Sequence, residues 1–461
     1  MMSLKVNLNQ TLKKIVGEEN VLELPEDMLP YALDASIIYR GMPKYVVRPH
    51  STEEVSEIVK LANEHRIPVI PRGAGTNFVG AAVPSNGGIV VDLTGMNRII
   101  EINPANLTCT VEAGVVHAKL ESELAKYGLF WPPDPGSSDA CTMGGVIAMN
   151  AGGMRALKYG TTRDWVLSLK VVLPNGEVIK TGSKTFKGNA GYDLTRLFVG
   201  SEGTLGIITE ATLKLRPIPE AENRISAYFD SIEKAGAAVS KIYLAGIVPA
   251  AIELMDKGVI TAVSKWLGKK FPDMDAYLIV SVDGSRSEVE LLANKVEHVL
   301  KESGASQVLR ATTQEEFNEI WLIRSEGATA LPNVTGKMNV THDVCVPINK
   351  LPEAFKAIRE ICNKYGIPVA IVSHAGDGNV HAIFSVDLKN PEEAARAKKA
   401  HDEMCRYIIK IGGTISGEHG IGIDKAELLV EEVGPTAMEL MRAIKRVFDP
   451  NNIMNPGKMG M

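Results

Sequence analysis

The sequence of 461 residues lacks the features that would tie it to a membrane, to nucleic acid or to the secretory route. No apolar run approaches the ~20 residues that span a bilayer. The first twenty residues lack the continuous apolar stretch of a signal peptide. Lysine and arginine total 50 against 55 acidic residues, and the net charge of −5 argues against a nucleic-acid binder. We expect a cytoplasmic protein, peripheral to a membrane only through a partner.

Cysteine is scarce. The five cysteines, none of which forms a Cys-x-x-Cys pair, are Cys109, Cys141, Cys345, Cys362 and Cys405. This spacing excludes a disulfide framework and argues against an internal iron–sulfur cluster. With 45% hydrophobic and 23% charged residues, the composition is that of a soluble globular enzyme. The length predicts two or three domains.

Glycine, in contrast, is abundant. The 42 glycines are about 9% of the chain, against the usual ~7%. They gather between Gly73 and Gly206 and again between Gly376 and Gly422. Because glycine allows positive φ and close approach of the backbone to a ligand, the two regions predict two loop systems around one or two ligands.

The chain changes character near residue 220. Before it, the pattern predicts a helix within Pro49–Pro68 capped by Ser51 or Thr52, strands at Ile67–Arg72 and Leu107–Gly114, and a hairpin at Ser168–Gly182. After it, a strand followed by a helix occurs three times, which predicts an α+β domain with an open sheet and helices on one face. We therefore predict domains at 1–220 and 221–410, with a C-terminal segment at 411–461.

The first glycine-rich loop, PRGAGTNFVGAAV, follows a predicted strand. Its glycines, Gly73, Gly75 and Gly80, fit the dinucleotide pattern Gly-x-Gly-x-x-Gly poorly, because the third comes two positions late and no helix is predicted after it. A loop whose backbone N–H groups hold a phosphate, or a plain surface loop, remains open. The nearly uncharged stretch Pro132–Gly160 favours a ligand, because a solvated loop should be more polar.

The second glycine-rich region, SHAGDGNVHAIF, places His374 and His381 on either side of a Gly-Asp-Gly-Asn turn. This predicts a β-hairpin with one histidine at each side of its mouth. Glu418 and His419 follow in SGEHGIGIDK. Two histidines and one carboxylate form the ligand set of an open zinc, iron(II) or manganese site, although a purely structural role stays open. For the remaining candidates we prefer the structural role: His50, His65, His117, His298 and His401.

The motifs VVRPHSTEEVSEIVKLANEHRIPVIPRGAGTN, VDLTGMNRI, LFWPPDPGSSDACTMGGVIAMNAGG and GSEGTLGIITEATLKL occur in this order. In this order the sequence resembles the vanillyl-alcohol oxidase / p-cresol methylhydroxylase superfamily, in its branch of glycolate oxidase flavoprotein subunits and D-lactate dehydrogenases. The resemblance covers nearly the whole chain. It implies an FAD-binding domain of the p-cresol methylhydroxylase type, an α+β substrate (cap) domain with an antiparallel sheet, and a C-terminal segment that returns to the flavin.

The resemblance also implies which residues bind FAD. Those placed on the pyrophosphate are Arg72, Gly73, Gly75, Thr76 and Asn77. Those placed along the ribityl chain and the isoalloxazine are Pro135, Gly136, Ser137, Thr142, Gly145, Asn150 and Gly152. Gly203, Gly206 and Ile208 would line the dinucleotide cleft, and Asn455 belongs to the family's C-terminal ending. Many relatives attach the flavin to a histidine of the first loop; this loop has none, so we expect non-covalent FAD.

By the same resemblance, His374, His381 and Glu418 hold the divalent metal and His419 is the base. Arg324 is the candidate for the substrate carboxylate, because a guanidinium binds a carboxylate through two hydrogen bonds; a helix-surface arginine is the alternative. The D-2-hydroxyglutarate branch has a lysine just before the Asp-Val-x-x-Pro motif. Here Val340, Thr341 and His342 precede Asp343, which argues against a second substrate carboxylate unless Lys337 replaces that lysine.

These features lead to the hypothesis of FAD-dependent oxidation of a small 2-hydroxy acid, with D-lactate to pyruvate first. The metal and Arg324 would bind the substrate, His419 would take the hydroxyl proton, and hydride would pass to flavin N5. An electron-transfer flavoprotein or an iron–sulfur subunit would then accept the electrons. The alternatives are glycolate as substrate, an oxygen-using oxidase, and an electron-relay subunit without substrate chemistry of its own.

Overall fold

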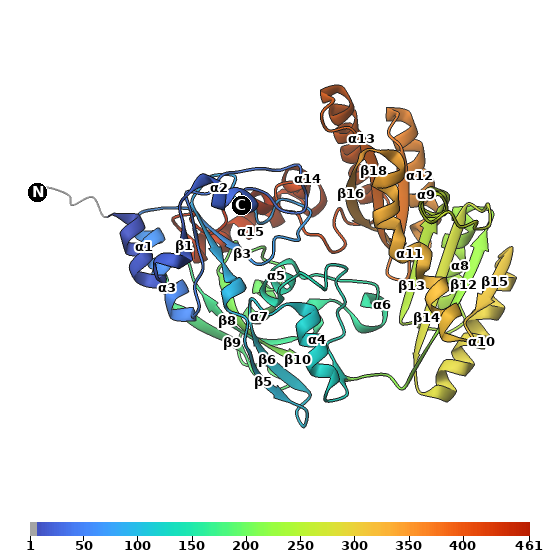
Figure 1. Ribbon diagram of the computed structural model, residues 1–461, viewed down its shortest axis with the longest axis horizontal. Coiled ribbons are helices and arrows are strands. Elements are labelled where there is room, and N and C mark those ends of the chain that lie inside the picture. Colours follow the sequence, from blue (N-terminus) through green and yellow to red (C-terminus); the bar gives the residue numbers. More distant parts are fainter. Residues whose placement is uncertain (1–6) are drawn as a thin grey trace, which may run out of the picture. The chain divides into compact units, whose positions relative to one another are not determined.

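Two units make up the fold in a computed structural model that describes residues 7–461. The first unit contains the chain up to Gly152, Thr161–Ile218 and His419–Met461, and the second contains Gly153–Gly160 and Pro219–Glu418. The colours of Figure 1 separate them, with blue, green and red for the first unit and yellow-green to orange for most of the second. Among the described residues no helix has the length and hydrophobicity to cross a membrane.

The first unit has two main sheets. The smaller runs in the order β1 (Val21–Leu22), β2 (Tyr45–Val47), β4 (Ile89–Asp92) and β3 (Val69–Arg72). The larger is antiparallel, in the order β5 (Ile99–Asn103), β6 (Thr108–Glu112), β10 (Ile207–Lys214), β8 (Val166–Val172) and β9 (Val178–Gly182). A short pair joins β7 (Leu129–Phe130) to β11 (Arg216–Pro217). The predicted strands near Ile67 and Leu107 and the hairpin at Ser168–Gly182 are therefore confirmed.

The helices of the first unit are short. They are α1 (Leu8–Val16), α2 (Pro25–Met28), α3 (Thr52–Glu64), α4 (His117–Ala125), α5 (Met143–Met149), α7 (Leu194–Phe198), α14 (Ala426–Val433) and α15 (Pro435–Phe448). The 3-10 turns of this unit are Glu18–Asn20, Leu29–Tyr31, Leu93–Gly95, Thr162–Asp164 and Lys458–Gly460. No helix lies between β3 and β4, so the first glycine-rich loop leads straight from one strand to the next.

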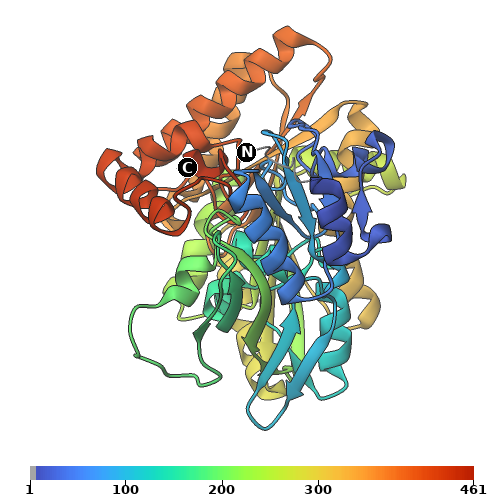
Figure 2. The same cartoon turned by 90° about the vertical axis from the view of Figure 1, so that its left-hand side faces the viewer.

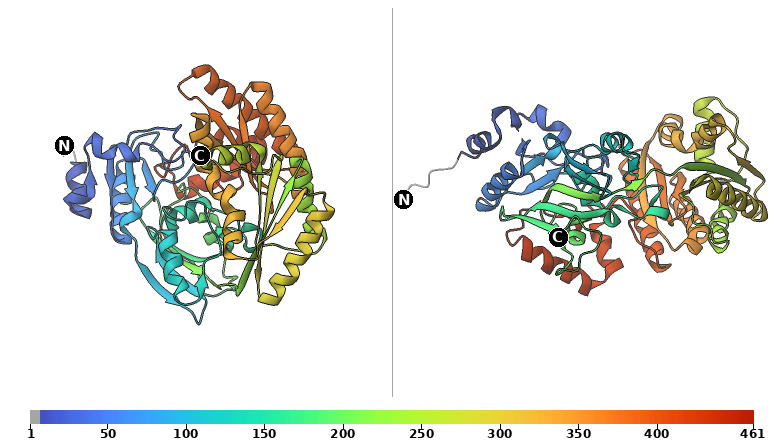
Figure 3. Two further views of the ribbon diagram at one scale, coloured as in Figure 1. Left: turned by 45° about the vertical axis from the view of Figure 1, so that its right-hand side comes forward. Right: turned by 90° about the horizontal axis from the view of Figure 1, so that it is seen from below.

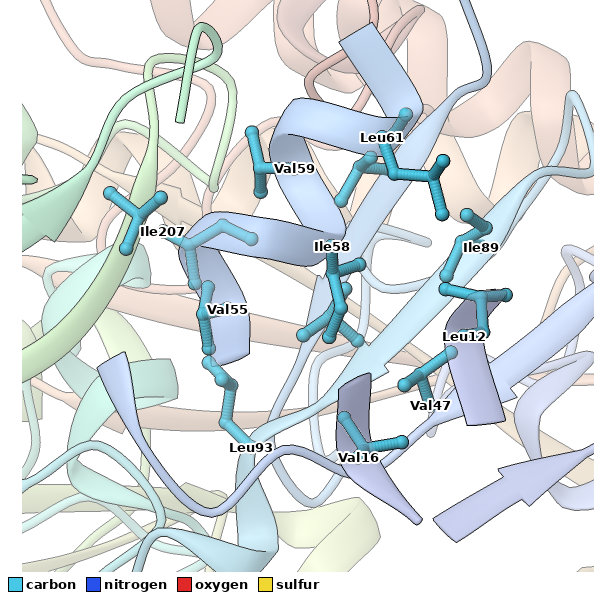
Figure 4. Packing of buried hydrophobic residues seen from close by; sticks show 14 of the residues in the cluster. Leu12, Val16, Val47, Val55, Ile58, Val59, Leu61, Ile89, Leu93 and Ile207 are labelled. Atoms are coloured by element: carbon cyan, nitrogen blue, oxygen red, sulfur yellow. The ribbon is translucent and has the colours of Figure 1, made fainter. Parts of the chain in front are cut away.

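Helix α3 confirms the helix predicted within Pro49–Pro68. The Ser51 hydroxyl caps it by accepting a hydrogen bond from the Glu54 N–H at 3.1 Å. Val55, Ile58 and Val59 are buried on one face, and α1 lies beside the helix (Figure 2). Figure 4 shows this face in the core between α1 and the strands.

The second unit is built on one antiparallel sheet of seven strands. Their order is β15 (Gln307–Arg310), β12 (Ala221–Phe229), β14 (Ala276–Gly284), β13 (Ala251–Asp256), β17 (Val369–His374), β18 (Asn379–Val386) and β16 (Met338–Cys345). Its helices are α6 (Ala156–Tyr159), α8 (Ile232–Leu244), α9 (Lys257–Leu267), α10 (Arg286–Glu302), α11 (Gln314–Thr335), α12 (Leu351–Tyr365) and α13 (Pro391–Lys410), with a 3-10 turn at Ile348–Lys350. The predicted antiparallel sheet and the three strand–helix units are confirmed.

The prediction that helices cover one face of this sheet is wrong, because both faces are covered. Tyr277 and Ile279 of β14 pack with residues of α9 and α11 in one core cluster. The alternate residues Leu278 and Val280 point to the opposite face and are also fully buried, where α8 and α10 contact the same strand. The left view of Figure 3 shows helices along this sheet.

Candidate active site

Strand register brings four side chains of the candidate site to one face of the sheet in the second unit. In the hairpin of β17 and β18, His374 pairs with Asn379 and Val372 pairs with His381. Glu253 of β13 lies opposite His374, and Asp343 of β16 lies opposite His381. Directly paired residues of antiparallel strands point to the same face, and so do residues two apart. Glu253, His374, His381 and Asp343 therefore share the face on which Val372 packs.

The two histidines meet Glu418, which follows α13 at the end of the second unit. The Nε2 atoms of His374 and His381 lie 3.5 Å and 3.3 Å from the same oxygen, Oε1 of Glu418. Their rings are nearly perpendicular, with centroids 5.0 Å apart. One ligand atom from each residue lies within 4.8 Å of the others. The sequence predicted this group, and the structure brings its three members together.

Two further carboxylates, those of Glu253 and Asp343, accept hydrogen bonds from this group and its neighbours. Oε1 of Glu253 accepts from Nδ1 of His374 at 2.7 Å, and Oε2 of Glu253 accepts from Nε of Arg324 at 2.6 Å. Asp343 accepts from the backbone N–H of Glu418 at 3.0 Å and from Nδ2 of Asn379 at 2.9 Å. The side chains of Glu253 and Asp343 are fully buried. Glu253 thus holds the imidazole of His374, and Asp343 holds the backbone of Glu418 against the sheet.

Each of these buried groups shifts the pKa of its neighbours. Burial would raise the pKa of the Glu418 carboxyl, but His374 and His381 hold that pKa well below its usual value. Burial would lower the pKa of His374, but the Glu253 carboxylate raises it well above its usual value. The pKa of Glu253 is likewise lowered against the effect of burial, by His374 and Arg324.

This donor set fits a divalent cation. Two imidazole nitrogens and a carboxylate oxygen converge, and three protein ligands leave positions open for a substrate. The hydrogen bond from Nδ1 of His374 to a carboxylate is the usual arrangement behind a metal-binding imidazole, because it leaves Nε2 for the metal. His374, His381 and Glu418 are therefore the residues that would hold the ion.

Arg324 lies on α11 with its Nε bound to Glu253, and its side chain is 23% exposed. Within residues 7–461 its two terminal nitrogens make no hydrogen bond. The guanidinium is thus anchored at one edge, and the edge needed for a carboxylate stays available. Lys337, the possible replacement for the missing lysine, pairs with Glu393 at 2.6 Å.

In the first unit, Gly73 and Gly145 lie around the hydroxyl of Thr142. A methyl group on Gly73 would come within 2.1 Å of Oγ1 of Thr142, and one on Gly145 within 3.4 Å. Oγ1 of Thr142 is buried and makes no hydrogen bond within the described part of the chain. A buried hydroxyl without a partner between two glycines fits a site for a polar ligand group, as FAD would supply.

Arg72 and Asn77 shape the first glycine-rich loop through backbone contacts. The Arg72 guanidinium donates to the carbonyls of Leu33 at 2.9 Å and Pro30 at 3.1 Å. Oδ1 of Asn77 accepts from the N–H of Val79 at 2.9 Å. Gly75 between them has φ +71°, a conformation that favours glycine. These side chains hold the loop in shape, and what they would do toward a phosphate stays a prediction.

Of the other residues predicted to bind FAD, some have defined contacts in the first unit and the others lie in its loops. Asn150 ends α5 with φ +50°, and Oδ1 of Asn150 accepts from the N–H of Arg163 at 2.9 Å. Nδ2 of Asn455 donates to the carbonyls of Ala81 at 2.9 Å and Glu202 at 2.7 Å. Gly206 and Ile208 pack against β8, and a methyl group on Gly203 would contact Pro71. The remainder lie in loops of this unit: Thr76, Pro135, Gly136, Ser137 and Gly152.

His419 directly follows Glu418 in the chain and belongs to the first unit. Its carbonyl accepts from Nδ2 of Asn77 at 2.9 Å, and its ring lies 5.0 Å from that of Phe78. The carboxylate of Glu202 accepts from the N–H of Ile421 at 2.7 Å. Burial raises the pKa of Glu202 to about 7, although this hydrogen bond acts in the opposite direction. Asn77 and Glu202 of the first unit therefore hold the segment that carries His419 at two points.

Glu253 and Asp343 were not among the residues predicted for the site. Each had a signal in the sequence: an acidic residue inside a strand, in AIELM and in VTHDVCV. A charged residue in such a strand requires a partner, because an unpaired buried charge is costly. The sequence did not show that these partners would be His374 and the segment carrying Glu418.

We expect a Gly73→Ala substitution to weaken FAD binding, so that the purified protein loses most of its FAD. The added methyl group would lie 2.1 Å from Oγ1 of Thr142, so the loop or the hydroxyl must move out of position. The measurement is the ratio of flavin absorbance to protein absorbance after desalting. Gly188→Ala in the exposed loop after β9 is the matched control, since its methyl would lie 3.7 Å from the nearest side chain. A Gly73→Ala protein that keeps a full complement of FAD would contradict this assignment.

Comparison with known proteins finds two family matches along the chain. Residues 43–182 match the family "FAD binding domain", and residues 218–459 match "FAD linked oxidases, C-terminal domain". The chain is 41% identical over 454 residues to the glycolate oxidase subunit GlcD of Bacillus subtilis (strain 168), covering 98% of this chain and 96% of that protein. It is 39% identical over 456 residues to a D-lactate dehydrogenase of Anaerostipes hadrus, covering 97% and 96%.

A solved structure of p-cresol methylhydroxylase with substrate bound shares the fold, with a TM-score of 0.82 and 22% identity over 98% of this chain and 96% of that chain. The protein is thus a flavoprotein oxidoreductase with an FAD-binding domain and a cap domain. More particularly, the chain belongs to the FAD-linked oxidases of the GlcD and D-lactate dehydrogenase type. The branch and the fold class predicted from the sequence are confirmed, and the chain has the fold of p-cresol methylhydroxylase.

Proposed function

We propose that this enzyme oxidises a small 2-hydroxy acid, D-lactate in the first place, to the 2-oxo acid with the help of a divalent metal. The observation that carries the proposal is the convergence of His374 and His381 on one oxygen of Glu418, within 3.5 Å. Arg324 is linked to the same group through Glu253. The group thus offers a cation site and a carboxylate-binding cation on one buried network.

Each group of the site has a distinct role. FAD, when bound, accepts the two electrons of the substrate Cα–H bond, and the divalent metal polarises the hydroxyl and carboxylate oxygens. His374, His381 and Glu418 hold that metal. Arg324 binds the substrate carboxylate through its terminal nitrogens and so fixes the orientation of the Cα–H bond.

His419 takes the proton of the substrate hydroxyl. It is the next residue after a metal ligand, so their Cα atoms are about 3.8 Å apart by covalent geometry alone. Asn77 donates a hydrogen bond to the carbonyl of His419, and Glu202 accepts one from the N–H of Ile421. These two bonds fix the backbone around the His419 imidazole. A positioned imidazole of this kind is a suitable general base at neutral pH.

A monocarboxylate is the substrate class that the residues favour. No lysine lies among Val340, Thr341 and His342, directly before Asp343, and Lys337 pairs with Glu393. Arg324 is then the cation offered to a single carboxylate. Glycolate is the second candidate, supported by the 41% identity to a protein named as a glycolate oxidase subunit.

FAD is proposed to be bound without a covalent bond, because the loop Gly75-Thr76-Asn77 offers no histidine. The electrons are proposed to leave through a protein acceptor, an electron-transfer flavoprotein or an iron–sulfur subunit. The name of the Bacillus subtilis relative, a subunit, supports an assembly of this kind. An oxygen-using oxidase and a relay subunit are the alternatives.

Anaerobic mixing of the purified protein with D-lactate, L-lactate and glycolate tests the proposal. We expect D-lactate to bleach the flavin absorbance fastest, with pyruvate formed in equal amount to reduced flavin. Acid precipitation should release the flavin into the supernatant. Faster bleaching by glycolate would select the second candidate. A flavin that none of the three reduces, while a chemical reductant bleaches it, would contradict the proposed activity and favour the relay subunit.

A further inference from the structure

Glu253 is the point at which the metal-binding group and the carboxylate-binding arginine meet. It lies in the middle of β13 and is fully buried. Its two oxygens have different partners, since Oε1 accepts from Nδ1 of His374 at 2.7 Å and Oε2 accepts from Nε of Arg324 at 2.6 Å. The strand register places it directly opposite His374. A buried carboxylate with both oxygens engaged has one orientation.

The imidazole of His374 needs such a partner to bind a cation. An imidazole that binds a metal through Nε2 keeps its remaining proton on Nδ1, and that proton needs an acceptor. Glu253 supplies the acceptor for His374. With Nδ1 bound to Glu253, the Nε2 atom of His374 is directed toward Glu418, 3.5 Å from its Oε1.

Glu253 also fixes Arg324. The Nε hydrogen bond sets the plane of the guanidinium, and so decides where its terminal nitrogens point. Without this bond, the long side chain of Arg324 would be free to rotate. Its partly buried charge would also lose its partner, which costs free energy. One carboxylate thus orients a metal ligand and the group that we assign to the substrate carboxylate.

We infer that Glu253 is a positioning residue that couples the divalent-metal site to the carboxylate-binding arginine. The inference rests on the proposed function for the role of Arg324, but its metal half stands on the geometry of His374 alone. Glu253→Gln has nearly the same shape and loses this function. Its side-chain oxygen can accept from only one of the two partners, and its NH₂ group then faces an N–H of the other.

The test measures Zn²⁺ binding to FAD-containing protein from which metal has been removed, by competition with a chromophoric chelator. We expect Glu253→Gln to weaken Zn²⁺ binding about 10- to 100-fold. At saturating Zn²⁺ the KM for the 2-hydroxy acid should rise, because Arg324 has lost its anchor. Glu253→Asp keeps the charge but spans a shorter distance, so it should weaken Zn²⁺ binding too, and it replaces the glutamine variant if that one does not fold.

Asp256→Asn is the matched control. Asp256 lies on the same strand, is buried, and pairs with Nη2 of Arg359 at 3.2 Å, but it is on the opposite face and contacts no proposed metal ligand. Its loss should lower thermal stability and leave Zn²⁺ binding unchanged. If Glu253→Gln and Glu253→Asp fold and bind Zn²⁺ as tightly as the unchanged protein, the inference is wrong. If no 2-hydroxy acid reduces the flavin of the unchanged protein, the proposed function fails, and the Zn²⁺ comparison is still decided by itself.

Discussion

The His419→Ala protein is expected to bind FAD normally and to leave it oxidised for far longer than the unchanged protein when D-lactate is added without oxygen. Loss of a positioned general base costs about 10²- to 10⁴-fold in the rate of the chemical step. The backbone carbonyl of His419 accepts a hydrogen bond from Asn77, and removal of the imidazole leaves this bond in place. Stopped-flow absorbance of the flavin measures the rate.

Two comparisons make this result specific. His65→Ala, at the exposed end of α3 in the same unit, should reduce its flavin at the normal rate. Zn²⁺ affinity of His419→Ala should stay within a few-fold of the unchanged protein, because the proposed ligands are intact. Flavin reduction at the normal rate in His419→Ala would remove this histidine from its role as the base.

We expect His381→Ala to lose both the metal and substrate-dependent flavin reduction. His381 is one of three proposed ligands, and its Nε2 lies 3.3 Å from Oε1 of Glu418. Loss of one ligand of three should weaken metal binding by more than the ~10- to 100-fold that follows from loss of an outer partner. Elemental analysis after dialysis, together with anaerobic flavin reduction, measures both effects.

His298→Ala on the surface of α10 is the control for His381→Ala, since His298 is exposed and pairs with Glu302 one turn away. It should keep metal, FAD and activity. A His381→Ala protein that retains one metal per chain and normal reduction would show that the ion is held elsewhere.

The elements that the sequence predicted well are those set by neighbours in the chain. Helix α3 follows from the cap at Ser51 and the apolar face of Val55, Ile58 and Val59. The hairpin of β17 and β18 follows from the turn between His374 and His381, and it places both histidines on one side.

Two features of the second unit were not predicted: the helices on both faces of its sheet, and the pairing of Glu253 with His374. The prediction of helices on one face failed although the run Tyr277–Val282 of β14 is apolar at nearly every position. Such a run indicates a strand buried on both faces. Glu253 and His374 are 121 residues apart, and they meet only because β13 and β17 are neighbours in the sheet. No local pattern contains that pairing.

The glycine-rich loops show a similar limit. The resemblance pointed to Gly73, Thr142 and Gly145, and the structure brings them together around one buried hydroxyl. The resemblance did not indicate that the side chains of Arg72 and Asn77 would form hydrogen bonds with backbone groups of loops. Such contacts depend on how loops pack, which spacing along the chain does not determine.

Metal content and flavin reduction measured on the same preparation test the central claim most directly. The protein is analysed for metals as purified, after exhaustive chelation, and after metal is returned, and D-lactate is then added to each sample without oxygen. The account predicts one divalent metal per chain, flavin reduction that stops on chelation while FAD stays bound, and recovery when metal is returned. Metal-free protein whose flavin D-lactate reduces at the full rate would contradict it.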